Sequence, residues 1–168
     1  TQCTTFKTQV LTVSLLKIGI LSDTHGAVHQ QIVELINDCD FALHAGDIVD
    51  RTIIKELEII SKVEVVKGNM DEADNPFPVK KVLNVEEVKI GLIHGNGTPF
   101  GIRDRIRAEF DELDIIVYGH SHKPYNKIEN EVLFFNPGTP TDKVFALCNS
   151  VGILEVNGNE AKGKIIRL

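Results

Sequence analysis

Residues 17–26 read KIGILSDTHG, and this stretch decides the fold. Its first half is a short apolar run, which is typical of a buried β-strand. The run meets polar residues abruptly at Ser22, and Asp23, Thr24 and His25 follow at once. Because open α/β sheets bind ligands at the carboxyl ends of their strands, this junction predicts a ligand site beside the first buried strand.

Strands and helices alternate through the first half of the chain. The predicted elements are, in order, a helix over residues 28–36, a strand over 41–43, a helix over 53–60 and a strand over 63–66. The strands are short apolar runs, and the helices carry apolar residues at helical spacing. This alternation predicts a parallel sheet with crossover helices.

The second half of the chain is richer in hairpins. Its predicted elements are, in order, a hairpin over residues 80–93, a helix over 102–113, a strand over 114–118, and hairpins over 125–135 and 151–168. We therefore predict one α/β domain over residues 17–168, with a parallel-rich sheet first and antiparallel strands later. The Thr-rich residues 1–16 are predicted to be an N-terminal extension or an extra edge strand.

The composition restricts the class of protein. A chain of 168 residues suits one domain, and 42% apolar with 25% charged residues is typical of a globular protein. The formal net charge of −6 argues against a stable complex with nucleic acid, which requires a basic surface. Bound cations can reverse the local sign, so a phosphate-bearing substrate is compatible with this charge.

The cysteines and the N-terminus predict a cytoplasmic protein without a membrane-spanning segment. Cys3, Cys39 and Cys148 are far apart and lack C-x-x-C spacing, as expected of reduced thiols. Lys17 interrupts the best apolar run, residues 11–21, which is therefore too short to span a bilayer. The N-terminus also lacks the basic start and small-residue cleavage site of a signal peptide.

Five polar clusters fall at the ends of predicted strands. In order they are Asp23-Thr24-His25, Gly46-Asp47, Gly68-Asn69, His94 and Gly119-His120-Ser121-His122. They offer oxygen and imidazole nitrogen but no sulfur, a donor set that suits Mn, Fe, Zn or Ni. One such cluster alone is usually chance, a turn or a structural histidine. Together they hold four of the six histidines, while His29 is assigned to a helix surface and His44 to a structural position near the site.

The ordered set D-x-H, G-D, G-N, H and G-H-x-H resembles the calcineurin-like metallophosphoesterase superfamily. The short chain, the motif spacing and residues 136–138 (Asn-Pro-Gly) resemble its small prokaryotic phosphodiesterase branch, and the resemblance spans residues 17–168. It implies an α/β fold, a four-layer αββα sandwich with two mixed β-sheets. It also implies two divalent metal ions, with Mn²⁺ expected and Fe, Zn or Ni as alternatives, and a hydroxide bridging them that cleaves a phosphate ester.

The same resemblance assigns the metal ligands. The first metal is expected to bind Asp23, His25 and His122, the second Asn69, His94 and His120, and Asp47 is expected to bridge both. The loop at residues 136–138 is expected to shape the pocket.

Substrate contacts and the general acid are less well defined. Asn69 and Asn96, which lie close to the ligand motifs in sequence, are expected to contact the substrate. Many relatives carry a histidine where this chain has Met70, and methionine has no proton to give. No residue is therefore assigned as the catalytic acid or base, and a metal-bound water and Asp71 are the next candidates for the acid.

Hydrolysis of a phosphodiester is the leading function, and a phosphomonoester is the alternative substrate. A protein-interaction scaffold of the same fold is a second alternative. The retromer subunit that resembles this family lacks part of the histidine set, whereas the set is complete here. A nuclease is disfavoured by the short, acidic chain. The expected partners are a small phosphoester, no membrane, and a second copy of the chain in a possible dimer or tetramer.

Overall fold

The computed structural model describes residues 15–142, 146 and 148–168, so most of the predicted N-terminal extension and Cys3 lie outside the described part. The elements are, in chain order, β1 (Leu16–Leu21), α1 (Gln30–Asn37), β2 (Phe41–His44), α2 (Thr52–Ile60), β3 (Val63–Val65), β4 (Lys80–Val85), β5 (Val88–Ile93), α3 (Ile102–Arg107), β6 (Ile115–Val117), β7 (Tyr125–Glu129), β8 (Val132–Asn136), β9 (Ser150–Asn157) and β10 (Glu160–Arg167).

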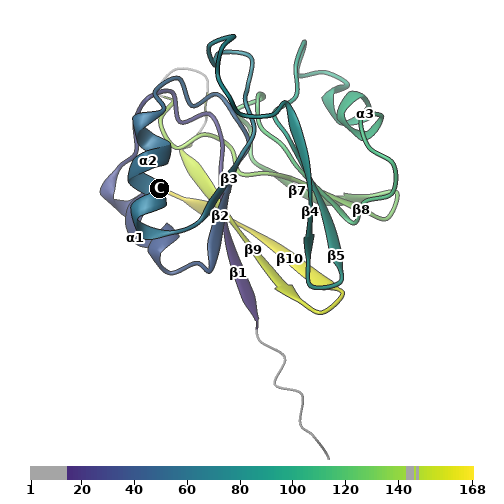
Figure 1. Cartoon of the computed structure of the whole chain (residues 1–168). Coiled ribbons are helices and arrows are strands. Elements are labelled where there is room, and N and C mark those ends of the chain that lie inside the picture. Colours follow the sequence, from purple (N-terminus) through teal and green to yellow (C-terminus); the bar gives the residue numbers. More distant parts are fainter. Residues whose placement is uncertain (1–14, 143–145, 147) are drawn as a thin grey trace, which may run out of the picture.

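These strands form two five-stranded sheets (Figure 1). The first sheet has the order β10-β9-β1-β2-β3 and the second the order β4-β5-β6-β8-β7. In each sheet three neighbouring strands are parallel, β1-β2-β3 in one and β5-β6-β8 in the other. The remaining strands pair antiparallel at the flanks. Both sheets are therefore mixed, which confirms the implied fold class and corrects the simpler prediction of antiparallel strands in the second half.

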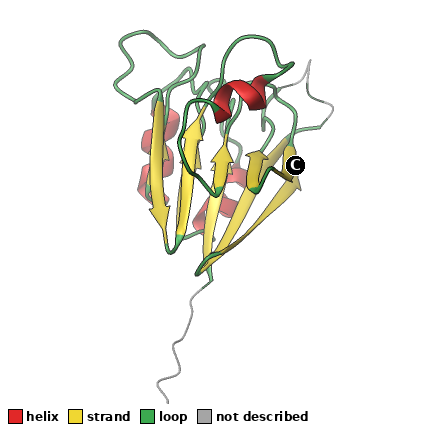
Figure 2. Cartoon of the chain, turned by 90° about the vertical axis from the view of Figure 1, so that its right-hand side faces the viewer, coloured by secondary structure: helices red, strands yellow, loops and turns green. Residues whose placement is uncertain are grey.

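Helices cover the outer faces of the two sheets, which face each other across the centre of the molecule (Figures 1 and 2). The helices α1 and α2 lie against the first sheet, and α3 lies against the second. A central apolar cluster joins the inner faces of the sheets, and two further clusters lie under the helices. This arrangement gives four layers in the order α, β, β, α.

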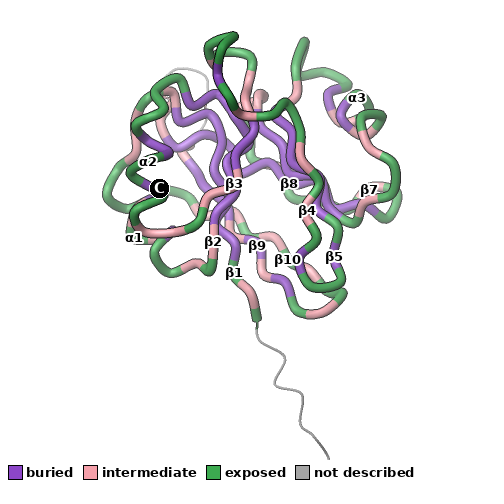
Figure 3. Tube along the Cα trace, in the orientation of Figure 1, coloured by how far each residue is buried: buried purple, intermediate pink, exposed green. Residues whose placement is uncertain are grey.

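Strand periodicity explains how one short strand serves two of these clusters. In β1, Ile18 and Ile20 point into the central cluster, whereas Leu21 belongs to the cluster under α1 and α2. In β6, Ile115 and Val117 point inward and Ile116 contacts the cluster under α3. Since successive side chains alternate between faces, such strands need apolar residues at every position. The central strands are accordingly buried along most of their length (Figure 3).

Two helices are shorter than predicted. Helix α1 begins at Gln30 rather than at residue 28, and α3 ends at Arg107 rather than at residue 113. The Arg107 guanidinium Nη1 donates to the carbonyl oxygens of Phe110 and Asp111, at 2.9 and 2.6 Å. These bonds satisfy carbonyl groups just past the end of the helix. The apolar residues that follow Arg107 at helical spacing therefore lie in a turn and loop. Neither helix, nor any other in the described part of the chain, is long and apolar enough to cross a membrane.

The Phe135 ring fills a slot between the sheets that two glycines create. A Cβ at Gly152 would lie 2.4 Å from Cε1 of Phe135, and a Cβ at Gly163 would lie 2.4 Å from its Cε2. Both contacts are shorter than any that carbon atoms tolerate, so β9 and β10 pack against the ring only because they lack side chains there.

Gly152→Ala is therefore expected to destabilise the fold by about 1–3 kcal/mol through overpacking. The same substitution should cost less in a Phe135→Leu background, where the ring that it strikes is absent. Urea unfolding of the four proteins in this cycle measures both effects. An unchanged midpoint for Gly152→Ala, or an equal cost in both backgrounds, would contradict the slot.

Candidate metal centre

The carboxyl ends of the two parallel triplets bring together the predicted ligands. After the strands of the first sheet come Asp23 and His25 (β1), Asp47 (β2) and Asn69 (β3), and after those of the second come His94 (β5), His120 and His122 (β6). Parallel strands end at the same edge of a sheet, so the loops that follow these five strands of the two sheets meet at one place.

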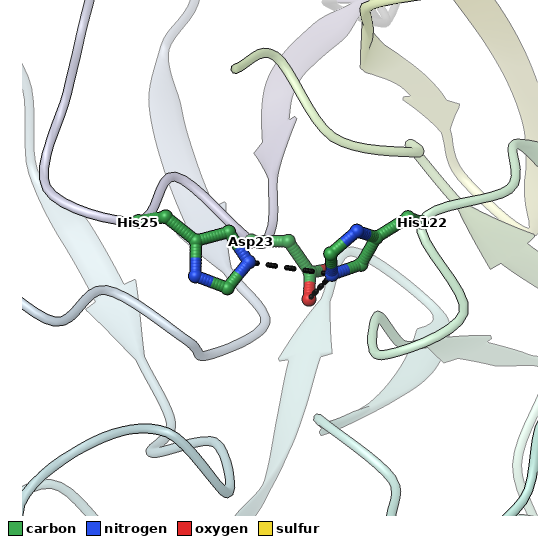
Figure 4. Close-up of side chains that lie close together, drawn as sticks. All are labelled: Asp23, His25 and His122. Atoms are coloured by element: carbon green, nitrogen blue, oxygen red, sulfur yellow. Dashed lines mark hydrogen bonds and ion pairs between the residues drawn. The ribbon is translucent and has the colours of Figure 1, made fainter. Parts of the chain in front are cut away.

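Asp23, His25 and His122 form a first donor group (Figure 4). The Nε2 atoms of the two histidines are 3.3 Å apart, and His122 Nε2 lies 3.2 Å from Asp23 Oδ1. One ligand atom from each residue lies within 4.8 Å of the others, which is close enough for a single ion to contact all three.

Asp23, Asp47 and His94 form a second donor group, which is fully buried. His94 Nε2 lies 3.2 Å from Asp47 Oδ2 and 3.9 Å from Asp23 Oδ1. Asp23 thus belongs to both groups and is the carboxylate that they share.

Asn69 links the remaining histidine to this cluster. Its Oδ1 lies 3.1 Å from His94 Nε2 and 2.8 Å from His120 Nδ1. The seven predicted ligands therefore form one continuous set of contacts. Asn96, the other predicted substrate contact, makes none with these ligands and instead lines a cavity next to Asn69 and His94.

The burial and hydrogen bonding of the Asp23 carboxylate indicate whether this cluster fits cations. Asp23 is fully buried, and its Oδ2 accepts hydrogen bonds from Ser22 Oγ at 2.6 Å and from the His120 amide at 3.1 Å. Its Oδ1 has no hydrogen-bond partner among the described residues, although it lies 3.2 Å from His122 Nε2 and 3.9 Å from His94 Nε2. A buried carboxylate oxygen without a donor is costly unless a cation binds it, so the residues fit divalent metal ions.

The electrostatics of the cluster also favour positive charge. The Asp23 carboxylate, whose Oδ1 lies 3.2 Å from His122 Nε2, raises the pKa of His122 to about 9, against the opposing effect of burial. Burial lowers the pKa of His94, but hydrogen bonding to Asp47 and the nearby Asp23 outweigh it and raise that pKa overall. Burial raises the pKa of Asp47, but the hydrogen bond to His94 and the His94 charge, with the Met70 amide and His25, together lower it overall. The buried carboxylates thus attract cations, whether protons or metal ions.

Two of the predicted ligand histidines, His94 and His122, are each held by an oxygen atom at Nδ1. His94 Nδ1 donates to the carbonyl oxygen of Ala45 at 2.7 Å, and His122 Nδ1 lies 2.6 Å from Asp142 Oδ2. Such contacts fix the tautomer of an imidazole and leave its Nε2 available to a metal. Asp142 was not predicted from the sequence, because it lies outside every strand and every recognised motif.

The backbone at the centre is strained. Of the described non-glycine residues with positive φ, five are predicted ligands: Asp23, His25, Asp47, His120 and His122, with φ between 45° and 66°. The left-handed region costs L-residues about 1–2 kcal/mol each, and such strain concentrates at functional sites. Gly68, which precedes the predicted ligand Asn69, is required for lack of space rather than for its φ angle, since a Cβ there would lie 2.1 Å from Asp47 Oδ1.

Asp71 stabilises this strained backbone and was considered from the sequence only as an acid. Its carboxylate accepts hydrogen bonds from four backbone amides at 2.7–3.1 Å, those of Asp47, Ile48, Val49 and Gly68. It therefore joins the turn after β2 to the turn after β3. Its neighbour Met70 is 60% exposed and contributes its backbone amide, which donates to Asp47 Oδ1 at 2.7 Å.

Two other predicted residues lie behind the centre. Burial lowers the pKa of His44 to about 4, and its neutral ring accepts from the Gly46 amide while Nε2 lies 3.1 Å from Thr24 Oγ1. Asn136 is buried and donates from Nδ2 to the carbonyl oxygen of Gly119 at 2.8 Å and to Ser121 Oγ at 3.1 Å. It thereby fixes the turn that carries the histidines after β6. His29, by contrast, lies at the N-terminus of α1, away from the cluster.

Comparison with known proteins agrees with this geometry. The family model of the calcineurin-like phosphoesterase superfamily domain matches residues 16–159. A probable metallophosphoesterase of Methanothermobacter thermautotrophicus is 34% identical over 89% of this chain and 91% of its own length. A phosphodiesterase of Methanocaldococcus jannaschii is 25% identical over 86% of this chain and 96% of its own length.

The fold also matches solved structures. The crystal structure of wild-type Vps29 of Entamoeba histolytica, complexed with Zn²⁺, aligns with a TM-score of 0.73 at 24% identity, covering 91% of this chain and 98% of that chain. The family match spans most of the chain, and the donor residues that the resemblance implied converge at one site. The chain therefore belongs to the calcineurin-like phosphoesterase superfamily, whose fold implies divalent metal ions and phosphoester hydrolysis.

Proposed function

We propose that this protein is a phosphodiesterase that uses two divalent metal ions. Asp23 carries the proposal, because its buried Oδ1 faces both donor groups and offers one carboxylate to two neighbouring cation positions. Family membership supports phosphoester hydrolysis, and the relative from M. jannaschii supports a diester substrate.

The ligand assignment follows the two groups. In this proposal His25 and His122 hold one ion together with Asp23, and Asn69, His94 and His120 hold the other. Asp47 is the bridge that the resemblance implies, and Asp23, the carboxylate common to both donor groups, lies beside both positions. Oxygen and imidazole donors without sulfur suit Mn²⁺, with Fe, Zn or Ni as alternatives. When bound, such ions supply a nucleophile at neutral pH by lowering the pKa of water, and they neutralise charge on the phosphate oxygens.

The chain's own residues orient these ligands and the substrate. Asp142 and the Ala45 carbonyl hold the imidazoles of His122 and His94 in place, and Asp71 holds the turn of Asp47. Asn69 and Asn96 line the adjoining cavity, where they can donate amide hydrogens to the phosphate or its ester arms. Because reacting groups held in fixed positions lose little entropy in the transition state, this rigidity serves the reaction.

A protein-interaction scaffold of the same fold is the alternative. A scaffold needs neither a strained backbone nor a buried carboxylate oxygen without a donor, and this chain has both at Asp23. Those two features favour the enzyme, and they also separate the two hypotheses experimentally.

Metal removal is the first test. Exhaustive chelation is expected to abolish hydrolysis of bis(4-nitrophenyl) phosphate, and Mn²⁺ is expected to restore it best. Elemental analysis of the reloaded protein should find two metal ions per chain, and a parallel assay with 4-nitrophenyl phosphate compares the diester with the monoester. Full turnover by protein shown to be metal-free would refute the mechanism, and metal-loaded protein that hydrolyses neither ester would favour the scaffold.

Asp47→Asn is expected to reduce kcat more than His25→Ala. The proposed bridge contacts both ions, whereas His25 contacts one, and the difference should exceed about tenfold since metal-orienting residues contribute about 10–100-fold. Asp74→Asn is a matched control, because Asp74 is exposed and lies outside the ligand set. Circular dichroism checks that the variants fold. Near-normal turnover of Asp47→Asn with both ions bound would show that Asp47 is not the bridge.

Met70 generates a prediction about leaving groups. The Met70 side chain cannot donate a proton, and Asp71 is occupied by four amide donors. A positioned general acid contributes about 10²–10⁴-fold when a poor leaving group must be protonated. Rates are therefore expected to fall steeply as the pKa of the leaving group rises across a series of aryl and alkyl phosphodiesters.

Met70→His is expected to make this dependence shallower, provided that chemistry is shown to be rate-limiting. Met70→Gln is the control, because an amide of similar length has no comparable acidity. A wild-type rate that hardly depends on the leaving group would show that another acid operates in this site.

A further inference from the structure

A cavity of about 210 Å³ adjoins the metal centre on the side of the second donor group. Two predicted ligands, Asn69 and His94, form its inner wall, so a phosphate held at the centre would direct one ester arm into it. Ile93 and Ile106 give it an apolar floor. Pockets that enclose drug-sized ligands measure about 300–1,000 Å³, so this cavity suits a short arm rather than a nucleoside.

The outer wall of the cavity is a fixed loop. The Arg105 guanidinium donates to the carbonyl oxygens of Asn96 and Phe100, both at 2.9 Å, and to that of Thr98. Between these residues, the Gly97 carbonyl oxygen lies 2.6 Å from His120 Nε2, which ties the loop to the metal centre. The cavity is therefore shaped before a substrate arrives.

Lys67 is a cation of this cavity that the protein itself does not neutralise. Among the residues that the structure describes, none forms an ion pair with its side chain, whereas the acidic residue in the lining, Glu109, is paired with Lys80 at 3.0 Å. The Lys67 backbone is fixed by a hydrogen bond from its amide to the carbonyl oxygen of Pro78 at 2.9 Å. Arg105, the other cation of the lining, is occupied by loop carbonyl oxygens, so Lys67 is the cation available to a ligand.

We propose that this cavity receives one ester arm of the substrate, and that Lys67 binds a negatively charged group on that arm. The inference rests on the proposed phosphodiesterase function and narrows its substrate class to esters with a short, anionic arm. The apolar floor contacts the carbon atoms of the arm, and Lys67 contacts its charge. A hydrogen bond to a charged group in such a site favours binding by about tenfold or more over a neutral analogue.

Two phosphonates test this assignment without turnover, because their carbon–phosphorus bond is not hydrolysed. One is 5-phosphonopentanoate, which carries a carboxylate, and the other is its neutral carboxamide. Calorimetry with the Mn²⁺-loaded protein is expected to show about tenfold tighter binding of the carboxylate, with a preference that shrinks at high salt. Lys67→Gln should remove the difference between the two compounds, and Lys67→Arg should keep most of it.

Lys89→Gln is the matched control, because it removes the same charge from an exposed position on β5 and should leave the preference intact. Equal binding of the two phosphonates by the wild type, or a preference that survives Lys67→Gln, would overturn the role of Lys67 alone. Failure of the metal-loaded protein to bind either phosphonate would instead count against the proposed function, and the inference would fall with it.

Discussion

The carboxylate of Asp23 is buried where two sheets meet, and one of its oxygens lacks a hydrogen-bond donor in the described structure. Leaving a charged group in this state costs more than the roughly 1–3 kcal/mol of an unsatisfied neutral group. Protonated histidines compensate in part, which is why the pKa values of His94 and His122 are raised. Divalent ions would compensate more fully, so the architecture of the site depends on a charge that the protein does not itself balance.

The strained ligands require a rigid foundation. Five of them have left-handed backbone conformations. The burial of apolar residues beneath the loops offsets the free-energy cost of these conformations. Hydrogen bonds also stabilise these turns. The Asp71 carboxylate accepts from four backbone amides, and Thr139 Oγ1 donates to the carbonyl oxygen of Asp23 at 2.8 Å. These residues contact no predicted ion, yet the ligand geometry depends on them.

The sequence was sufficient to predict what is local or periodic. Buried strands such as residues 17–21 can be recognised by their apolar composition. Every predicted ligand of the centre lies among the polar residues that follow such a run. It failed where individual side-chain contacts matter. The Arg107 side chain donates to carbonyl oxygens just past the end of α3, and the role of Asp142 depends on its contact with His122. Neither contact has a periodicity or a motif that one sequence can reveal.

The division between ligand residues and cavity residues explains how one fold serves several functions. A likeness to Vps29 at 24% identity shows shared architecture, and architecture alone does not specify activity. The predicted metal ligands follow five strands and are positioned by the sheets, whereas Lys67, Asn96 and Arg105 lie on connections beyond the strands or on the short helix α3. Substitutions in the second set can change what binds without moving the first set. In our proposal the cavity next to His94, rather than the metal centre itself, therefore selects the substrate.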